Sequence, residues 1–196
     1  MFVIYLYTMS KKREIFNVSL YVAFFFVLML LTSTYFVIVL TNFDNSIAQK
    51  TKDYVVLDNQ DISSYYTESE LNHLDEVKDL FDNFVDVLKY LWLSFILIIY
   101  FLRTRFFHIS KKIFNEAFKL TTVVIVIATL IKLTFFDNLF AFFHRLFFTT
   151  QWIFDSSSLL IQLFPLRFWM EKTFEVVVLS FVFYFVVLML YRKRLK

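Results

Sequence analysis

The sequence predicts an all-α membrane protein, with four transmembrane helices and a small extracytoplasmic cap, in a single domain of residues 1–196. Of its 196 residues, 59% are hydrophobic and only 19% are charged, and its mean hydropathy is +0.64. A soluble domain of this length could not bury so much apolar surface. The apolar residues also gather into runs close to the roughly 20 residues that a helix needs to cross a bilayer.

Four apolar runs are the expected transmembrane helices: 18–40, 84–102, 117–136 and 174–191. The second run contains Asp86 and Lys89 near its start, and the third contains Lys132 near its end. Charged side chains near a helix end can reach the closer membrane interface. We therefore expect both of these runs to span the membrane as well.

The positively charged residues predict the orientation of these helices. They gather before the first run, after the second and at the end of the chain: Lys11, Lys12, Arg13, Arg103, Arg105, Lys111, Lys112, Lys119, Arg192, Lys193, Arg194 and Lys196. Because loops rich in Lys and Arg stay on the cytoplasmic side, both termini should be cytoplasmic. The segments 41–83 and 137–173 then face outward and form the cap. Residues 41–64 are the one stretch that we expect to be flexible.

Two missing residue types exclude several classes of function. Without glycine, the chain has no dinucleotide-binding fingerprint, P-loop or nucleophile elbow. Without cysteine, it has no disulfide, iron–sulfur cluster or cysteine nucleophile. The net charge of +3 does not indicate nucleic-acid binding, because the basic residues lie at the ends of the apolar runs. We expect no cofactor and no nucleic-acid partner.

The first cap segment contains a helix start and a histidine. Thr67 and Glu70 have the spacing of a capping box, and apolar residues then recur at helical intervals into the second run. His73 lies where the apolar and polar faces of this helix meet. Glu70 and Glu76, on either side of it, are expected to reach its imidazole. A neighbouring carboxylate fixes the tautomer of a histidine and raises its basicity, as a general base requires.

The second cap segment contains a histidine among phenylalanines. His144 is followed by Trp152 and Asp155. Partial burial should lower the pKa of this imidazole unless Asp155 compensates. Arg145 is suited to hold a lipid phosphate or to pair with a carboxylate. A single histidine in either position is more often an interfacial or packing residue than a catalytic one.

Together, the two outward histidines predict one shared site at the lipid surface. One alternative is a metal-dependent membrane hydrolase, with zinc held by His73, Glu76, His144 and Asp155. Neither an HExxH spacing nor a His-rich stretch supports that alternative. The other alternative is a non-catalytic membrane scaffold or partner subunit in which both histidines only pack.

Two blocks of sequence resemble a known family. Residues 65–78, YYTESELNHLDEVK, resemble the His-containing motif of the bacterial lipoprotein intramolecular transacylases, Lit. Residues 142–148, FFHRLFF, and residues 152–155, WIFD, resemble the second histidine motif of that family. Glu76 stands where the family usually has aspartate, and serines 156–158 stand where its turn usually carries proline and aspartate. Neither departure touches the histidines.

The resemblance implies an acyltransferase of the bacterial plasma membrane, with its active site on the extracytoplasmic side. Its substrate would be a diacylglyceryl lipoprotein. The N-terminal cysteine amine would take the sn-2 acyl chain from its own glyceryl group, which gives lyso-form lipoprotein. His73 and His144 would be catalytic, with the base not assigned between them. The supporting residues would be Glu70, Glu76, Arg145, Trp152 and Asp155. We expect a monomer in contact with membrane lipids.

Overall fold

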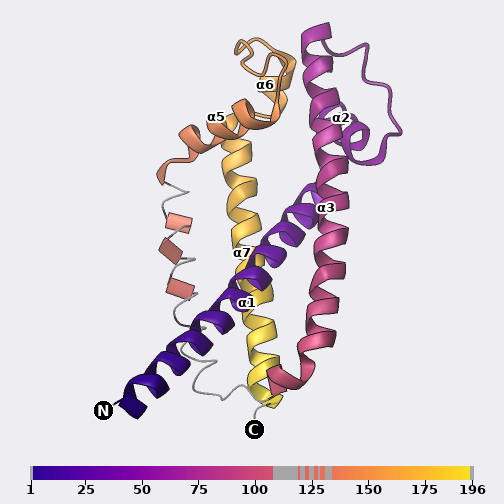
Figure 1. Ribbon diagram of the computed structural model, residues 1–196. Helices are drawn as coiled ribbons and strands as arrows, with labels where there is room; N and C mark the ends of the chain where they lie inside the picture. Colours follow the sequence, from indigo (N-terminus) through magenta and orange to yellow (C-terminus); the bar gives the residue numbers. More distant parts are fainter. Residues whose placement is uncertain are drawn as a thin grey trace.

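The computed structural model describes residues 2–107 and 134–194, together with positions 119, 122, 123, 126, 127, 129 and 130. Every element in the two long ranges is an α-helix, which confirms the predicted all-α class there. The helices are α1 (Phe2–Leu40), α2 (Ser46–Leu57), α3 (Glu68–Phe107), α5 (Phe136–Phe147), α6 (Leu159–Leu163) and α7 (Leu166–Arg194). Three of them are long, and α2, α5 and α6 gather toward one end of the molecule (Figure 1).

One segment of the described helices is long and apolar enough to cross a membrane, as judged by its length and composition. It is Phe16–Leu40 in α1, with 25 residues, and it would extend about 37 Å at 1.5 Å per residue. The expected runs 84–102 and 174–191 fall inside α3 and α7. The run 117–136 lies mostly outside the described residues. The number of four transmembrane helices therefore stays a prediction.

The long helices are held together by large side chains. Helix α1 packs against both α7 and α3. Leu28 and Met29 of α1 are buried with Leu88 of α3. Phe26 meets Tyr184 of α7 edge to face, with 5.5 Å between the ring centroids. The chain has no glycine, and the fully buried Ser33 of α1 and Ser180 of α7 are the small residues among these large side chains.

Helix α3 begins as the capping box predicts. The backbone N–H of Thr67 donates to the Glu70 carboxylate at 2.9 Å, and the Glu70 N–H lies 3.4 Å from the Thr67 hydroxyl oxygen. The helix then continues for 40 residues into the expected second apolar run. Helix α7 starts at Leu166 rather than at residue 174, directly after Pro165. Proline fixes a φ compatible with a helix start and needs no N–H partner there.

The expectation of a flexible stretch at 41–64 was wrong, because this stretch contains α2. The Asn45 side chain caps the helix by accepting from the N–H groups of Ile47 and Ala48, at 2.9 and 3.1 Å. The Thr51 and Tyr66 hydroxyls form a buried hydrogen bond of 2.6 Å. Polar composition misled the prediction, since a short helix with a good N-cap needs few apolar residues when it packs on other helices.

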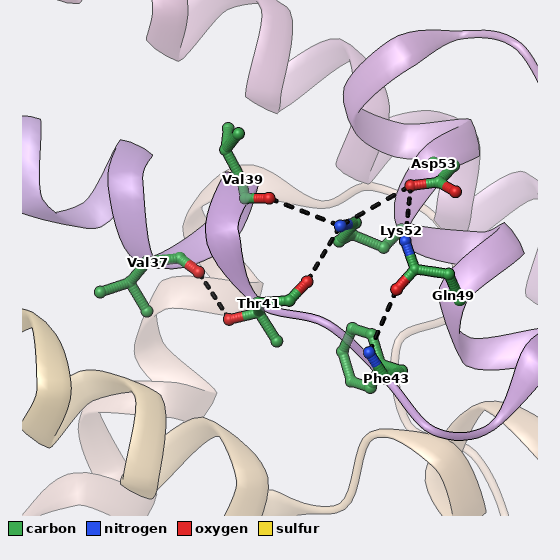
Figure 2. Close-up of polar contacts among 7 residues, drawn as sticks. All are labelled: Val37, Val39, Thr41, Phe43, Gln49, Lys52 and Asp53. Atoms are coloured by element: carbon green, nitrogen blue, oxygen red, sulfur yellow. Dashed lines mark hydrogen bonds and ion pairs between the residues drawn. The ribbon is translucent and has the colours of Figure 1, made fainter.

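Side chains of α2 also bind the C-terminal end of α1 and the turn that follows it (Figure 2). The Lys52 ammonium donates to the carbonyls of Thr41 and Val39, at 2.9 and 3.4 Å. These carbonyls lie at the C-terminal end of α1, where the helix leaves acceptors without partners and where a positive charge is favourable. The Gln49 side chain accepts from the N–H of Phe43 at 3.1 Å and fixes the turn between the two helices.

Candidate functional site

The first turns of α3 carry His73, and α5 carries His144. The centroids of the two imidazoles lie 5.9 Å apart, with 27° between the ring planes. The chain between α5 and α6, residues 148–158, passes over the same part of α3; we call it the covering loop. Figure 1 shows α5 and α6 at the end of the molecule where α3 begins. Tertiary folding thus joins two histidines from separate cap segments into one pair.

His73 is enclosed by aromatic rings. Its side chain is only 6% exposed, and the ring centroids of Phe148 and Phe154 lie 4.7 and 5.7 Å from its own. Its Nδ1 atom is buried and has no hydrogen-bond partner among the described residues. Burial, and then the nearby His144, lower the pKa of His73 to about 4, against an opposing effect of Glu76. His73 is therefore neutral at pH 7.

The tautomer of His144 is fixed within its own helix. Its Nδ1 lies 2.9 Å from the carbonyl oxygen of Phe140, one turn earlier in α5. Because a carbonyl only accepts, Nδ1 carries the hydrogen and the Nε2 lone pair stays available. Burial lowers the pKa of His144, partly offset by the Phe140 carbonyl. The rings of Phe140, Phe148 and Trp152 surround the imidazole at 4.1, 5.0 and 5.1 Å between centroids.

Glu76 does not bind the imidazole of His73, contrary to the prediction. Its carboxylate accepts instead from the backbone N–H groups of Thr149 and Thr150, at 3.1 to 3.2 Å. It also accepts from both threonine hydroxyls, at 2.7 Å for Thr150. Burial would raise the pKa of Glu76, but these hydrogen bonds lower it to about 2. Glu76 thus anchors the start of the covering loop to α3.

Glu70 anchors the other end of the covering loop, and its predicted contact with His73 is also wrong. The Glu70 side chain is 4% exposed. Its carboxylate accepts from the Ser158 hydroxyl and from the N–H of Leu160 at 3.2 Å. Burial would raise the pKa of Glu70, and these bonds, together with those from Thr67, lower it. The two carboxylates beside His73 therefore act on the loop that covers it.

The other predicted supporting residues divide into two groups. Trp152 lies against His144, as given above. Asp155 is exposed and accepts from the Ser157 N–H and hydroxyl at 2.9 and 2.8 Å, so it closes a turn of the loop and does not compensate His144. Arg145 is exposed on α5.

In the described ranges, no three His, Asp or Glu side chains are grouped to hold a metal. The zinc set is not assembled because Glu76 and Asp155 bind other donors.

Sequence reasoning missed the residues that enclose the pair. Phe148 and Phe154 lie in the two blocks of the second histidine motif, but nothing in those blocks connects them with His73, and Thr149 and Thr150 lie between the blocks. The two threonines directly follow a run of phenylalanines at the end of α5, which marks a helix end but not a partner. Their contacts with Glu76 join positions 73 and 74 residues apart in the chain. A single sequence contains no signal that would pair them.

Comparisons with known proteins agree with this fold. A model of the family "Lipoprotein intramolecular transacylase Lit" matches residues 47–169, which include both histidines. An uncharacterized protein of Aquifex aeolicus is 29% identical over 127 residues, which are 63% of this chain and 55% of that protein. The chain thus spans about half the length of this curated relative.

Solved structures show the same fold. Two variants of the membrane-integral Lit from Bacillus cereus, with a histidine replaced by alanine or by arginine, each align with a TM-score of 0.65 and 15% identity. The alignments cover 98% and 97% of this chain and 99% and 94% of the neighbour. The family match extends over more than half of the sequence and contains the histidine pair, so this chain belongs to the lipoprotein intramolecular transacylase Lit family.

Proposed function

We propose that this protein moves the sn-2 acyl chain of a diacylglyceryl lipoprotein onto the α-amine of the N-terminal cysteine of the same lipoprotein. The observation that carries the proposal is the pair of neutral imidazoles, 5.9 Å apart between centroids, under an aromatic covering loop. Acyl transfer to an amine moves a proton from the amine to the leaving oxygen and develops an oxyanion on the way, and two imidazoles can supply the base and the hydrogen-bond donor for these events. The family membership supports this reaction.

The reaction conserves every atom of the lipoprotein. The amine nitrogen attacks the ester carbonyl carbon and forms a C–N bond as it loses a proton. The bond between that carbon and the sn-2 oxygen breaks, and the glyceryl oxygen takes up the proton. The product is an N-acyl, S-monoacylglyceryl lipoprotein with the same mass as the substrate. One base that first accepts and then returns a proton is therefore sufficient.

The tautomer of His144 supports it as that base. Its Nδ1–H is engaged by the Phe140 carbonyl, so Nε2 presents a lone pair. An α-amine has a pKa of about 7.7 to 8.0 and a free imidazole about 6.5; burial lowers the pKa of His144 further, so its Nε2 is unprotonated and free to take the proton that the attacking amine loses. His73 then supplies the second group. Because Nδ1 is buried and has no partner in the part of the chain that the structure describes, a hydrogen is better placed on Nε2, from which it can donate to the tetrahedral oxyanion.

The aromatic surroundings support transfer over hydrolysis. Phe148, Phe154 and Trp152 line the two imidazoles, and such rings leave little room for water. Water in the site would compete with the amine and release the acyl chain. Because nucleophile and ester belong to one molecule, the remaining task of the protein is to hold them at reacting distance. A covering loop anchored at both ends by Glu76 and Glu70 performs that task.

The reaction is tested by mass spectrometry of the N-terminal peptide of a reporter lipoprotein. Cells would express this chain, His73→Ala or His144→Ala. Fragmentation separates the isobaric diacylglyceryl and N-acyl, monoacylglyceryl forms. We expect conversion by the parent chain and a loss of about 10²-fold or more in rate for either variant. His108→Ala is the matched control, since this third histidine lies in the basic segment and should not be required.

A result without conversion would overturn the proposal. If the reporter keeps its diacylglyceryl form while the parent chain is present in the membrane, the protein is not a transacylase.

The proposal also includes the placement of the protein: four transmembrane helices in a bacterial plasma membrane, cytoplasmic termini and a site on the outer side. Fusions of a periplasmic and a cytoplasmic reporter enzyme at 41–83 and at the C-terminus test it directly. Activity of the cytoplasmic reporter at 41–83 would contradict the predicted orientation.

A further inference from the structure

Helix α5 has an exposed apolar side that the histidine site does not use. Leu139, Phe142, Phe143 and Leu146 recur at helical spacing and form one stripe, the α5 stripe. All four are exposed, Phe142 and Leu146 by 62% each. Scattered single apolar residues are normal on protein surfaces, but four large ones in a row on a twelve-residue helix mark a surface that is covered in use.

The rest of the same helix faces elsewhere. Phe136 is buried and Phe140 contacts both His144 and Trp169, which makes the inward side. Asn138 and Arg145 are seven positions apart, so they share a third, polar side next to the stripe, and both are exposed. In the described part of the chain, Arg145 forms no ion pair with a carboxylate. Helix α5 thus has a protein side, an apolar outer side and a cationic polar side.

We propose that α5 lies in the plane of the membrane surface, with the α5 stripe inserted among lipid acyl chains and Arg145 directed at the phosphate layer. Helix α5 runs across the direction of α3 and α7 at the end of the molecule where the site lies (Figure 1). An amphipathic helix that lies across spanning helices at one end has the geometry of an interfacial helix. An arginine beside its apolar side fits an anionic lipid headgroup.

The neighbouring turn of α7 supports lipid as the occupant. Trp169 is 38% exposed, and its ring lies 6.5 Å from that of Phe140. Tryptophan is enriched at the depth of the lipid headgroups, where its apolar ring and polar N–H each find a suitable environment. Through Phe140, α5 therefore packs on a residue typical of the membrane interface, which favours lipid over a second protein as the occupant of the stripe.

The position of α5 at the membrane surface bears on catalysis only if the proposed function holds, and in that case it explains how the substrate reaches the site. His144 directly follows Phe143 of the stripe, so the imidazole lies about 100° around the helix from a lipid-inserted ring. The glyceryl esters of a diacylglyceryl group lie at the boundary between acyl chains and headgroups. A helix held at that boundary brings His144 to the depth of the sn-2 ester. The substrate then reaches the site sideways from the lipid layer.

Because the chain has no cysteine, single spin labels test this placement cleanly. Phe142→Cys and Leu146→Cys label the stripe, and Asn138→Cys labels the polar side of the same helix as a matched control. The labelled protein is placed in vesicles of phosphatidylethanolamine and phosphatidylglycerol. We expect collisions with apolar oxygen to exceed those with a water-soluble nickel chelate several-fold at 142 and 146, and the reverse at 138.

Two results would overturn the proposal. If the nickel chelate reaches 142 and 146 as well as it reaches 138, the stripe faces water. If the labels at 142 and 146 show spin–spin broadening that disappears on dilution with unlabelled protein, a second copy of the chain covers the stripe. Neither measurement depends on acyl transfer. An unchanged reporter lipoprotein together with lipid-exposed labels would refute the proposed function and leave the placement intact.

Discussion

Replacement of Glu76 by alanine should release the covering loop from α3. The carboxylate holds four donors, the N–H and hydroxyl groups of Thr149 and Thr150. The half-buried Thr150 contacts dominate, since a hydrogen bond to a charged acceptor contributes about 1.5–3 kcal/mol. The exposed Thr149 contacts contribute little, because water replaces them. We expect a loss of about 2 kcal/mol, which corresponds to a roughly 30-fold larger population of the open loop at 1.36 kcal/mol per tenfold.

The charge of Glu76 sets the pH range of this effect. The pKa of Glu76 is about 2 in the folded protein, against about 4.3 for an unperturbed glutamate. A lowered folded-state pKa stabilises the protein above the unfolded pKa, and this stabilisation is lost as the pH falls through the folded one. The difference between the parent chain and Glu76→Gln should therefore be constant from pH 8 to about pH 5 and should shrink below it.

Hydrogen exchange measured by mass spectrometry, with the protein in lipid nanodiscs, tests the release. Peptides that cover 148–158 should exchange faster in Glu76→Ala, and Glu76→Gln, which keeps one acceptor oxygen, should lie between it and the parent chain. Glu68→Ala is the matched control, because this exposed glutamate lies on the same first turns of α3. Unchanged exchange of the loop in a folded Glu76→Ala protein would show that the Glu76 carboxylate does not anchor the covering loop on α3.

Three further predictions concern other parts of the site. Burial lowers the pKa of His73 to about 4, so its protonation is disfavoured in the fold; the melting temperature should fall from about pH 6.5 down to pH 4, and His73→Phe should weaken that dependence. Ser158→Ala removes one donor to the Glu70 carboxylate and should destabilise the protein by about 1 kcal/mol, seen as a lower midpoint in thermal unfolding, while Ser156→Ala should have little effect. Treatment with a strong chelator should leave the conversion of the reporter lipoprotein unchanged. A loss of conversion that added zinc restores would instead support a metal-dependent enzyme.

Several features of the molecule followed from local sequence patterns. The capping box at Thr67 and Glu70 predicted the start of α3, because both partners lie within one turn and their spacing alone decides the contact. Apolar periodicity predicted the continuous helix that follows. The same patterns placed His73 and His144 in two separate cap segments. These patterns depend on residues within one or two helical turns of each other, and helix formation depends on the same short spacing.

The roles of Glu70 and Glu76 could not be predicted in this way. Helical spacing placed both carboxylates near His73, and the tertiary structure directs them instead to Thr149, Thr150, Ser158 and Leu160. The N–H groups of Thr149 and Thr150, in the loop after α5, and of Leu160, in the first turn of α6, have no intrahelical acceptor. They need an acceptor more than a neutral imidazole does, so the carboxylates bind them once the covering loop packs on α3. Sequence alone determined where α3 begins and that it continues into the second apolar run, and it singled out the two histidines. Only the fold decided which donors each carboxylate meets, because those partners lie far apart in the chain and packing alone brings them together.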